Sequence, residues 1–247
     1  MLELYHAGLT TCSKKARHGL KEKGVPYKSH LMRLDKFEHH TPEYLKLNPN
    51  GIVPTLVHDG KVIIESCIIN EYADEVFPGP KLQPEDPYLR AKMRVFCKMA
   101  DEYGLPATRV PTWTRTKTEQ LKAADDTAFD KIIKDTPLID HQLKMKALRA
   151  GGFSDGDFEE AYGKMQYCYD RVEAALADGP YVAGQQFTLG DIAILPYLDA
   201  FRGPRPDLME SHKRVKEWYQ RVMARPATKA TYEPSDEAPS FARRPAA

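Results

Sequence analysis

The feature that most constrains the fold is a change of hydrophobic pattern at residues 77–87, a segment with four prolines in eleven residues. Before this segment, short alternating stretches typical of strands come between stretches with helical spacing. After it, strand patterns nearly vanish and the apolar residues recur with helical spacing. Because a proline cluster ends regular structure, we expect an α/β domain that is followed by an all-α domain.

The first part is expected to have the order β-α-β-α-β-β-α. Strands are predicted over residues 2–5, 27–34, 53–57 and 61–64, and helices over residues 11–24, 41–44 and 66–77. Asp59-Gly60 predicts a two-residue hairpin turn. Ser66 is expected as the N-cap of the last helix.

The second part is expected to be helical throughout. Helices are predicted over residues 88–102, 118–134, 136–150, 155–177, 188–200 and 211–224. We therefore expect a first domain over residues 1–79, a linker over 80–87, a helical domain over 88–232 and a loosely ordered tail over 233–247. The tail is rich in Pro, Ser, Ala and charged residues, a composition that disfavours a packed structure.

Composition and charge exclude several classes of function. The 247 residues include 36 Lys and Arg and 35 Asp and Glu, and a net charge of +1 argues against a dedicated nucleic-acid binder. No apolar run approaches the ~18 residues that a membrane span needs, and no secretory signal pattern is present, so a cytoplasmic location is expected. Four widely spaced cysteines favour neither a disulfide framework nor a zinc site, and no metal is expected.

The first candidate for chemistry lies at residues 8–13, where a strand ends and a helix begins. Cys12 and Ser13 place a thiol and a hydroxyl at this point. The unpaired N–H groups and partial positive charge of a helix N-terminus stabilise an anion by about 0.3–1 kcal/mol, and they lower the pKa of a thiol. The alternative is that Thr11 or Ser13 simply caps the helix.

Two further segments suit the binding of a small peptide. Proline at the start of a strand belongs at an edge or beside a ligand, and the Val53-Pro54 bond is a candidate for the cis form. A cis bond would turn the Val53 backbone outward, where it could pair with an extended peptide; the alternative is an ordinary turn. Glu65 and Ser66, at a strand–helix junction, suit the ammonium and carboxylate of an amino acid.

Thr188 and Asp191 have the spacing of a capping box before an apolar helix. We interpret this pair as structural, with Asp191 buried to hold the start of the helix.

Together these segments resemble the soluble glutathione transferases over about residues 1–230. The matching segments are residues 11–13, 48–54, 65–66 and 188–191. The resemblance implies a thioredoxin-like N-terminal domain, an all-helical C-terminal domain, glutathione as cosubstrate, and a dimer with the active site between the domains.

The resemblance also implies roles for individual residues. Val53, beside cis-Pro54, would pair its backbone with the cysteinyl part of glutathione. His40 lies where family members often place a polar or basic group on the glycyl carboxylate. The γ-glutamyl end would be held by Glu65 and Ser66, and some members also use a residue at the position of Asp101 that reaches across the dimer.

Three stretches, over residues 36–40, 93–103 and 137–144, are similar to the bacterial β-aryl etherases of lignin breakdown. Those enzymes use glutathione to displace a phenol from the β-carbon of an aromatic ketone. Their first-helix motif tends to be Asn-Ser, whereas this chain has Cys12-Ser13. We expect Ser13 to activate the thiol, and Tyr103 and Trp113 to line an apolar pocket for aryl groups, although Trp113 could equally be a packing residue.

Two other functions stay open from the sequence. Cys12 could be a nucleophile that forms a mixed disulfide with glutathione, in thiol–disulfide exchange or glutathione removal. The chain could also be a non-catalytic glutathione-binding subunit. The dimer could contain two identical chains or a related second chain.

Overall fold

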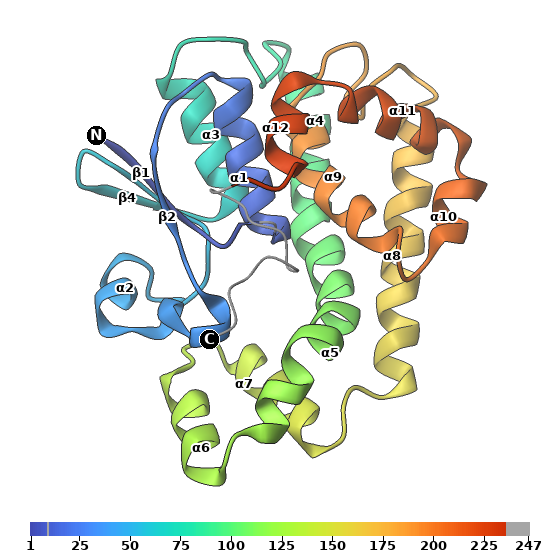
Figure 1. Cartoon of the computed structure of the whole chain (residues 1–247). Helices are drawn as coiled ribbons and strands as arrows, with labels where there is room; N and C mark the ends of the chain where they lie inside the picture. The colour runs from blue at the N-terminus through green and yellow to red at the C-terminus, as the bar shows by residue number, and fades with distance from the viewer. Residues whose placement is uncertain (9, 236–247) are drawn as a thin grey trace.

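The computed structural model describes residues 1–8 and 10–235, and its first part is built on a four-stranded mixed sheet (Figure 1). The strands are β1 (Leu2–His6), β2 (Lys28–Leu31), β3 (Thr55–His58) and β4 (Lys61–Ile64), in the order β2-β1-β3-β4. β1 runs parallel to β2 and antiparallel to β3, which pairs with β4. This is the thioredoxin-like sheet that the resemblance implied.

Two helices, α1 (Thr11–Glu22) and α3 (Ser66–Val76), pack side by side on the sheet (Figure 1). Leu4 and Leu56 occupy paired positions on β1 and β3, and both are fully buried. Apolar residues of the two helices cover them, namely Ala16, Leu20, Ile69 and Ala73. The alternating pattern of β1 thus turns one face toward the helices, as a half-buried strand does.

The turns of this domain follow from backbone conformation. Asp59 and Gly60 have φ of 49° and 79°, which confirms the two-residue hairpin between β3 and β4. The predicted cap of α3 is wrong by one residue. Glu65, with φ of 68°, occupies the cap position, and Ser66 is the first helical residue.

The segment between the two parts is fixed by a buried ion pair. Lys23 Nζ lies 3.0 Å from Asp74 Oδ1 and donates to the carbonyl oxygen of Pro80 at 2.8 Å. The Asp74 carboxylate also accepts from the backbone N–H groups of Leu82 and Gln83. The chain therefore enters the helical part in a defined position.

The second part is all-helical, as expected (Figure 1). Its helices are α4 (Pro87–Met99), α5 (Leu105–Ala123), α6 (Asp126–Asp135), α7 (Ile139–Ala150), α8 (Asp155–Ala175), α9 (Leu189–Phe201), α10 (Pro206–Ser211), α11 (Lys213–Met223) and α12 (Pro226–Tyr232). Short helical segments also occur at η1 (Leu34–Lys36), η2 (Glu38–His40), α2 (Pro42–Leu47) and the π-helical turn η3 (Ala100–Gly104). α9 is the central helix, because nearly all of its residues are buried.

Several expected helix boundaries are wrong. Residues 105–117, which were expected to lack a helix, form most of α5. The expected helix over residues 118–134 is divided between α5 and α6, because the Asp125 side chain accepts from Ala128 N and starts a new helix. The short helices α10 and α12 were not expected. The predicted tail falls mostly on residues 236–247, which lie outside the described residues.

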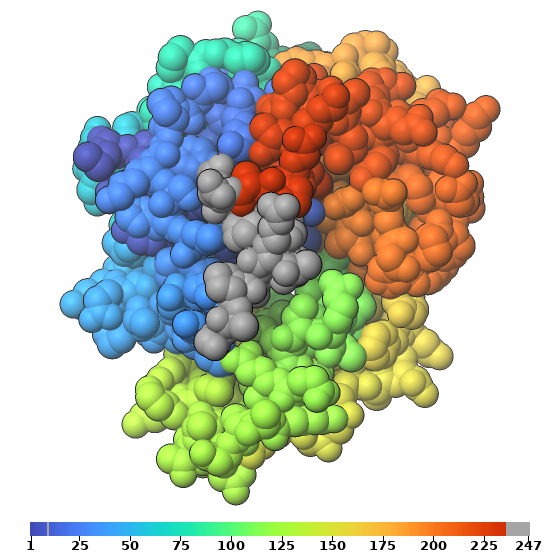
Figure 2. Space-filling view, viewed as in Figure 1, coloured from blue at the N-terminus to red at the C-terminus, as the bar shows by residue number. Residues whose placement is uncertain are grey.

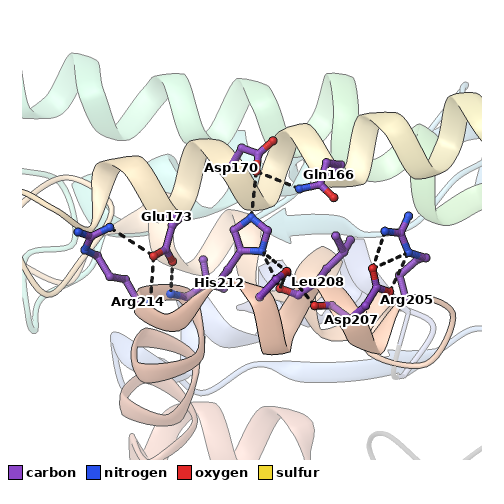
Figure 3. A network of polar contacts seen from close by, with 10 residues as sticks. Gln166, Asp170, Glu173, Arg205, Asp207, Leu208, His212 and Arg214 are labelled. Carbon is purple, nitrogen blue, oxygen red and sulfur yellow. Dashed lines mark hydrogen bonds and ion pairs between the residues drawn. The ribbon is translucent and has the colours of Figure 1, made fainter.

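Polar contacts join α8 to α10 and α11 (Figure 3). His212 Nε2 lies 2.9 Å from Asp170 Oδ1, and His212 Nδ1 lies 2.7 Å from the carbonyl oxygen of Leu208. Glu173 of α8 contacts Arg214 and the backbone N–H of Val215 at the start of α11.

The last helices also contact the first domain. α12 packs on α1, and Figure 2 shows the red C-terminal segment against the blue N-terminal one. Arg225 donates two hydrogen bonds of 2.7 Å to the Glu22 carboxylate, and Arg17 donates to the carbonyl oxygen of Thr231. None of the helices built by the described residues combines the length and apolar character needed to cross a membrane.

Candidate active site

A cavity of about 340 Å³ opens between the two parts of the chain. Its walls are the tip of α1, the η1–η2 segment, the chain before β3, one face of α5, part of α7 and the end of α9. The size is within the range of small-molecule sites, about 300–1,000 Å³. Most of the exposed lining is apolar, which suits an organic ligand.

The α1 tip offers unpaired hydrogen-bond donors to this cavity. Thr10, Thr11 and Cys12 line it, and no side chain caps the helix. The first N–H groups of a helix have no partner within the helix, so those of α1 remain available to a ligand. The Thr11 hydroxyl makes no hydrogen bond with another residue among those described. This end of the cavity therefore suits an anionic atom.

Ser13 is not brought into the cavity. Its side chain is fully buried, and Ser13 Oγ accepts from Ala7 N at 3.0 Å and from Thr10 Oγ1 at 2.8 Å. The hydroxyl thereby holds Ala7 and Thr10 against the start of α1. Cys12 does line the cavity, and Cys12 Sγ lies 3.5 Å from Tyr197 Oη of α9.

The chain before β3 presents backbone groups beside the α1 tip. The Val53-Pro54 bond is cis, as the sequence indicated, and Val53 lines the cavity. Asn48 Nδ2 and Tyr44 Oη both donate to the carbonyl oxygen of Ile52, which fixes this loop. No hydrogen bond joins the Val53 N–H or C=O to another described residue, so both are available for strand addition.

Glu65 and Asp101 lie near one buried lysine, Lys15. Lys15 Nζ donates to Asp101 Oδ1 at 2.5 Å and lies 3.2 Å from Cys67 Sγ. Burial, then the negative charge of Asp101, raises the pKa of the Glu65 carboxyl. The side chain of Asp101 is 39% exposed. The structure thus brings Asp101 near Glu65 of its own chain, and neither residue lines the cavity described above.

His40 and His39 lie on η2 in the cavity wall. Burial lowers the pKa of His40 to about 4 and that of His39 to about 2. Both imidazoles are therefore neutral near pH 7, and His40 can offer a hydrogen bond but no charge to a carboxylate. His39 Nδ1 is buried and has no hydrogen-bond partner among the described residues.

Of the two residues that were expected to line a pocket for aryl groups, one lines the cavity and the other does not. Trp113 lines the cavity from α5, and its ring packs edge-on to His141 of α7 at 5.0 Å between ring centroids. Tyr103 does not line the cavity; it is 37% exposed and stacks on Tyr167 at 4.9 Å. Helical periodicity explains the difference, because Tyr103 lies two residues before the lining residue Leu105 and thus near the opposite face.

Several lining residues were not predicted from the sequence. The most informative of them are Thr11, Phe37, Arg109, Lys117 and His141. Arg109, Trp113 and Lys117 are spaced four residues apart, so they share one face of α5. That signal was present in the sequence, but it became visible only once α5 was known to be a helix. No group of three or more His, Cys, Asp or Glu residues in the described part of the chain could hold a metal ion.

Comparisons with known proteins agree with this geometry. Two family profiles match the chain: "Glutathione S-transferase, N-terminal domain" over residues 11–76 and "Glutathione S-transferase, C-terminal domain" over residues 88–226. The chain belongs to the glutathione S-transferase family. This confirms the expected family, its fold class and its class of enzyme.

Individual relatives narrow the comparison. Protein LigF from Sphingobium sp. strain SYK-6 is 34% identical over 242 residues, which cover 95% of this chain and 94% of the relative. The crystal structure of β-etherase LigF from that strain has a TM-score of 0.87 at 33% identity and covers 94% of this chain and 98% of its own. Glutathione S-transferase 3 of Zea mays is 29% identical over 234 residues, 93% of this chain and 92% of the relative.

Proposed function

We propose that this glutathione S-transferase cleaves β-aryl ethers of the lignin type, with glutathione as the nucleophile. The observation that carries the proposal is the cavity itself: an uncapped helix tip suited to a thiolate faces an aromatic wall suited to aryl groups. Similarity to the β-etherase LigF over almost the whole chain supports the same reaction. His39 and His40 of η2 and His141 of α7, which line the cavity, lie in stretches that resemble this group.

The proposed reaction is a nucleophilic displacement. A thiol such as that of glutathione has a pKa near 8.5, so only a small fraction is thiolate at neutral pH. Donors at the α1 tip, namely the first N–H groups of the helix and the Thr11 hydroxyl, stabilise the thiolate, and each unit of lowered pKa corresponds to about 1.4 kcal/mol. The sulfur bonds to the β-carbon, the C–O bond breaks, and its electron pair leaves with the phenoxide, which takes up a proton.

Glutathione is proposed to lie with its cysteinyl backbone on Val53, beside Pro54, and with its γ-glutamyl end at Glu65 and Ser66. Ser66 begins α3, and no side chain caps that helix, so its first N–H groups can receive the γ-glutamyl carboxylate. We place the glycyl end toward His40. We also propose a cytoplasmic dimer in which the half-exposed Asp101 contributes to glutathione bound by the partner subunit.

Product analysis tests the reaction. Incubation with glutathione and a β-aryl ether ketone is expected to release a phenol and a glutathione thioether in equal amounts. Absence of the thioether with both enantiomers of the ether would show that the proposed reaction is wrong.

Three variants separate the roles of the helix tip. We expect Thr11→Val to raise the pKa of bound glutathione, followed by thiolate absorbance, and to lower turnover about tenfold, since one hydrogen bond is lost. Ser13→Ala should act more weakly through the loop that it positions, whereas Cys12→Ala should keep most of the turnover. If Cys12→Ala abolishes turnover and the wild type accumulates a mixed disulfide, the enzyme instead performs thiol–disulfide exchange.

A further inference from the structure

The cavity has an unbalanced charge at one end. Four basic side chains line it, and no Asp or Glu is among its described lining residues; the four are Lys14, Arg109, Arg115 and Lys117. Lys14 and Arg109 are paired from outside the lining, with Asp199 at 3.1 Å and Asp140 at 2.7 Å. Arg115 is exposed to solvent. Lys117 is half-buried and forms no ion pair with any of the residues that the structure describes.

Lys117 lies between two aromatic rings. Its Nζ is 5.1 Å from the ring centroid of Trp113 and 5.4 Å from that of Phe37. Such cation–π contacts offset only part of the cost of removing an ammonium from water. Burial accordingly lowers the pKa of Lys117 to about 8, and the nearby Asp35 carboxylate, which binds Arg33, opposes this only in part. An anion bound here would supply the ion-pair partner that Lys117 lacks among the described residues.

Neutral donors lie beside this ammonium. The two rings that Lys117 contacts also pack against three imidazoles. The Phe37 centroid lies 6.0 Å from that of His39 and 5.6 Å from that of His40, and the Trp113 centroid lies 5.0 Å from that of His141. One of the buried imidazole nitrogens, His39 Nδ1, lacks a partner among the described residues. One ammonium with neighbouring N–H donors matches the several acceptor positions of a carboxylate.

We propose that the enzyme selects aryl ethers that carry a carboxylate, and that Lys117 binds this carboxylate while Trp113 contacts the attached ring. This inference rests on the proposed function, because it names the substrate class of the same site. Lys117 follows Trp113 by four residues on the same face of α5, and Lys117 Nζ lies 5.1 Å from the centroid of the Trp113 ring. A carboxylate bound at Lys117 therefore brings an adjoining aryl group within reach of Trp113 in the same cavity.

The glycyl carboxylate of glutathione is the competing occupant, and paired ligands distinguish the two. We would compare a β-aryl ether acid with its methyl ester, each with glutathione and with the glycyl ethyl ester of glutathione. Wild-type kcat/KM is expected to be about 10- to 100-fold higher for the acid, the range of one charge-assisted hydrogen bond. The preference should persist when the glycyl ester replaces glutathione.

Variants assign the preference to one side chain. Lys117→Met keeps the length of the side chain and should reduce the ratio of acid to ester turnover to about 1, whereas Lys117→Arg should keep most of it. Lys131 is an exposed lysine of α6 outside the cavity, and Lys131→Met is the control. This variant should change the turnover of neither the acid nor the ester. KM for the acid should also rise as the pH passes about 8, because Lys117 loses its proton, while KM for the ester should not follow this pH dependence.

A binding measurement keeps the inference testable even if no ether is cleaved. Calorimetry with a non-reactive aryloxy carboxylic acid and its methyl ester, on enzyme saturated with glutathione, should give tighter binding of the acid. Equal binding and turnover of acid and ester would overturn the inference while leaving the proposed reaction intact. Loss of affinity only with the glycyl ester would assign Lys117 to glutathione and would also overturn it.

Discussion

At the scale of single residues, burial decides how much a capping carboxylate contributes to the stability of the fold. The described part of the chain has two capping boxes, at the starts of α8 and α9. In α9, Asp191 is fully buried and accepts from Val182 N, Trp218 Nε1 and both the N–H and hydroxyl of Thr188. In α8, Asp157 accepts only from Ser154 and is exposed.

We expect Asp191→Asn to lower the free energy of unfolding by about 3 kcal/mol. An amide has a single acceptor oxygen, and its NH₂ group would face donors at a fully buried position. Asp157→Asn makes the same chemical change in an exposed box and should cost about 0.5–1 kcal/mol. Urea unfolding of both variants measures the difference. Similar losses in the two variants would contradict this account of burial.

Local spacing explains which residues could be predicted. Thr188 and Asp191 are three residues apart, and the capping box that they form depends only on the helix that they start. The cis bond before Pro54 was also indicated locally. The direction of the Ser13 side chain was not, because whether its hydroxyl faces the cavity or contacts Ala7 and Thr10 depends on where β1 ends relative to α1.

At the scale of elements, the junction of α4 with α5 depends on a close approach to α9. Gly104 ends the π-helical turn, and a Cβ there would lie 2.8 Å from Cγ and 3.1 Å from Cβ of Tyr197. Cγ and Cβ of Tyr197 lie close to the backbone, so they cannot move without shifting α9. Tyr197 also contacts Cys12 at the α1 tip, so the junction is linked to the active site.

Gly104→Ala is therefore expected to destabilise the protein by about 1–3 kcal/mol, the usual cost of overpacking a core. It should also reduce turnover, because Tyr197 would be displaced toward Cys12. Gly163→Ala, inside α8 with open space around it, is the matched control and should stabilise by about 0.5–1 kcal/mol. Thermal unfolding and steady-state kinetics measure both effects. A stable, fully active Gly104→Ala enzyme would refute the argument.

The same junction explains the main error in the predicted elements. Pro106 lies in the first turn of α5, but Pro111 lies inside the helix, where proline is disfavoured. Packing of α5 against α7 and α8 outweighs this local preference. Because the expected helix began only at residue 118, the shared face of Arg109, Trp113 and Lys117 was not recognised from the sequence.

At the scale of the whole molecule, α1 contacts Arg225 and α12, and this contact joins the two parts of the structure. Arg225 makes a bidentate pair with Glu22, whose side chain is 6% exposed, and His18 Nε2 lies 3.4 Å from the same carboxylate. Glu22 and Arg225 are 203 positions apart in sequence, so no local pattern predicts their pairing. Burial raises the pKa of Glu22, but the hydrogen bonds from Arg225 and His18 outweigh it and hold the pKa at about 2.

Because the pKa of Glu22 is lowered in the folded state, the contribution of the Glu22–Arg225 pair to stability depends on pH. Unfolded Glu has a pKa near 4.5, so the pair stabilises the folded state by about 3 kcal/mol above that pH and loses its contribution as the pH falls toward 2. Arg225→Met should therefore lower the free energy of unfolding by about 3 kcal/mol at pH 7, and the difference from wild type should shrink as the pH falls below 4.5.

Arg205→Met is the matched control, because Arg205 forms a bidentate pair with the exposed Asp207 within one helix terminus and should contribute less than about 1 kcal/mol. Urea unfolding between pH 3 and pH 7 distinguishes the two variants. A difference between Arg225→Met and wild type that does not change with pH would mean that Arg225 acts only through packing, for instance on the Phe187 ring, whose centroid lies 3.9 Å from its guanidinium carbon. The charge of Glu22 would then not hold the end of the chain on the first domain.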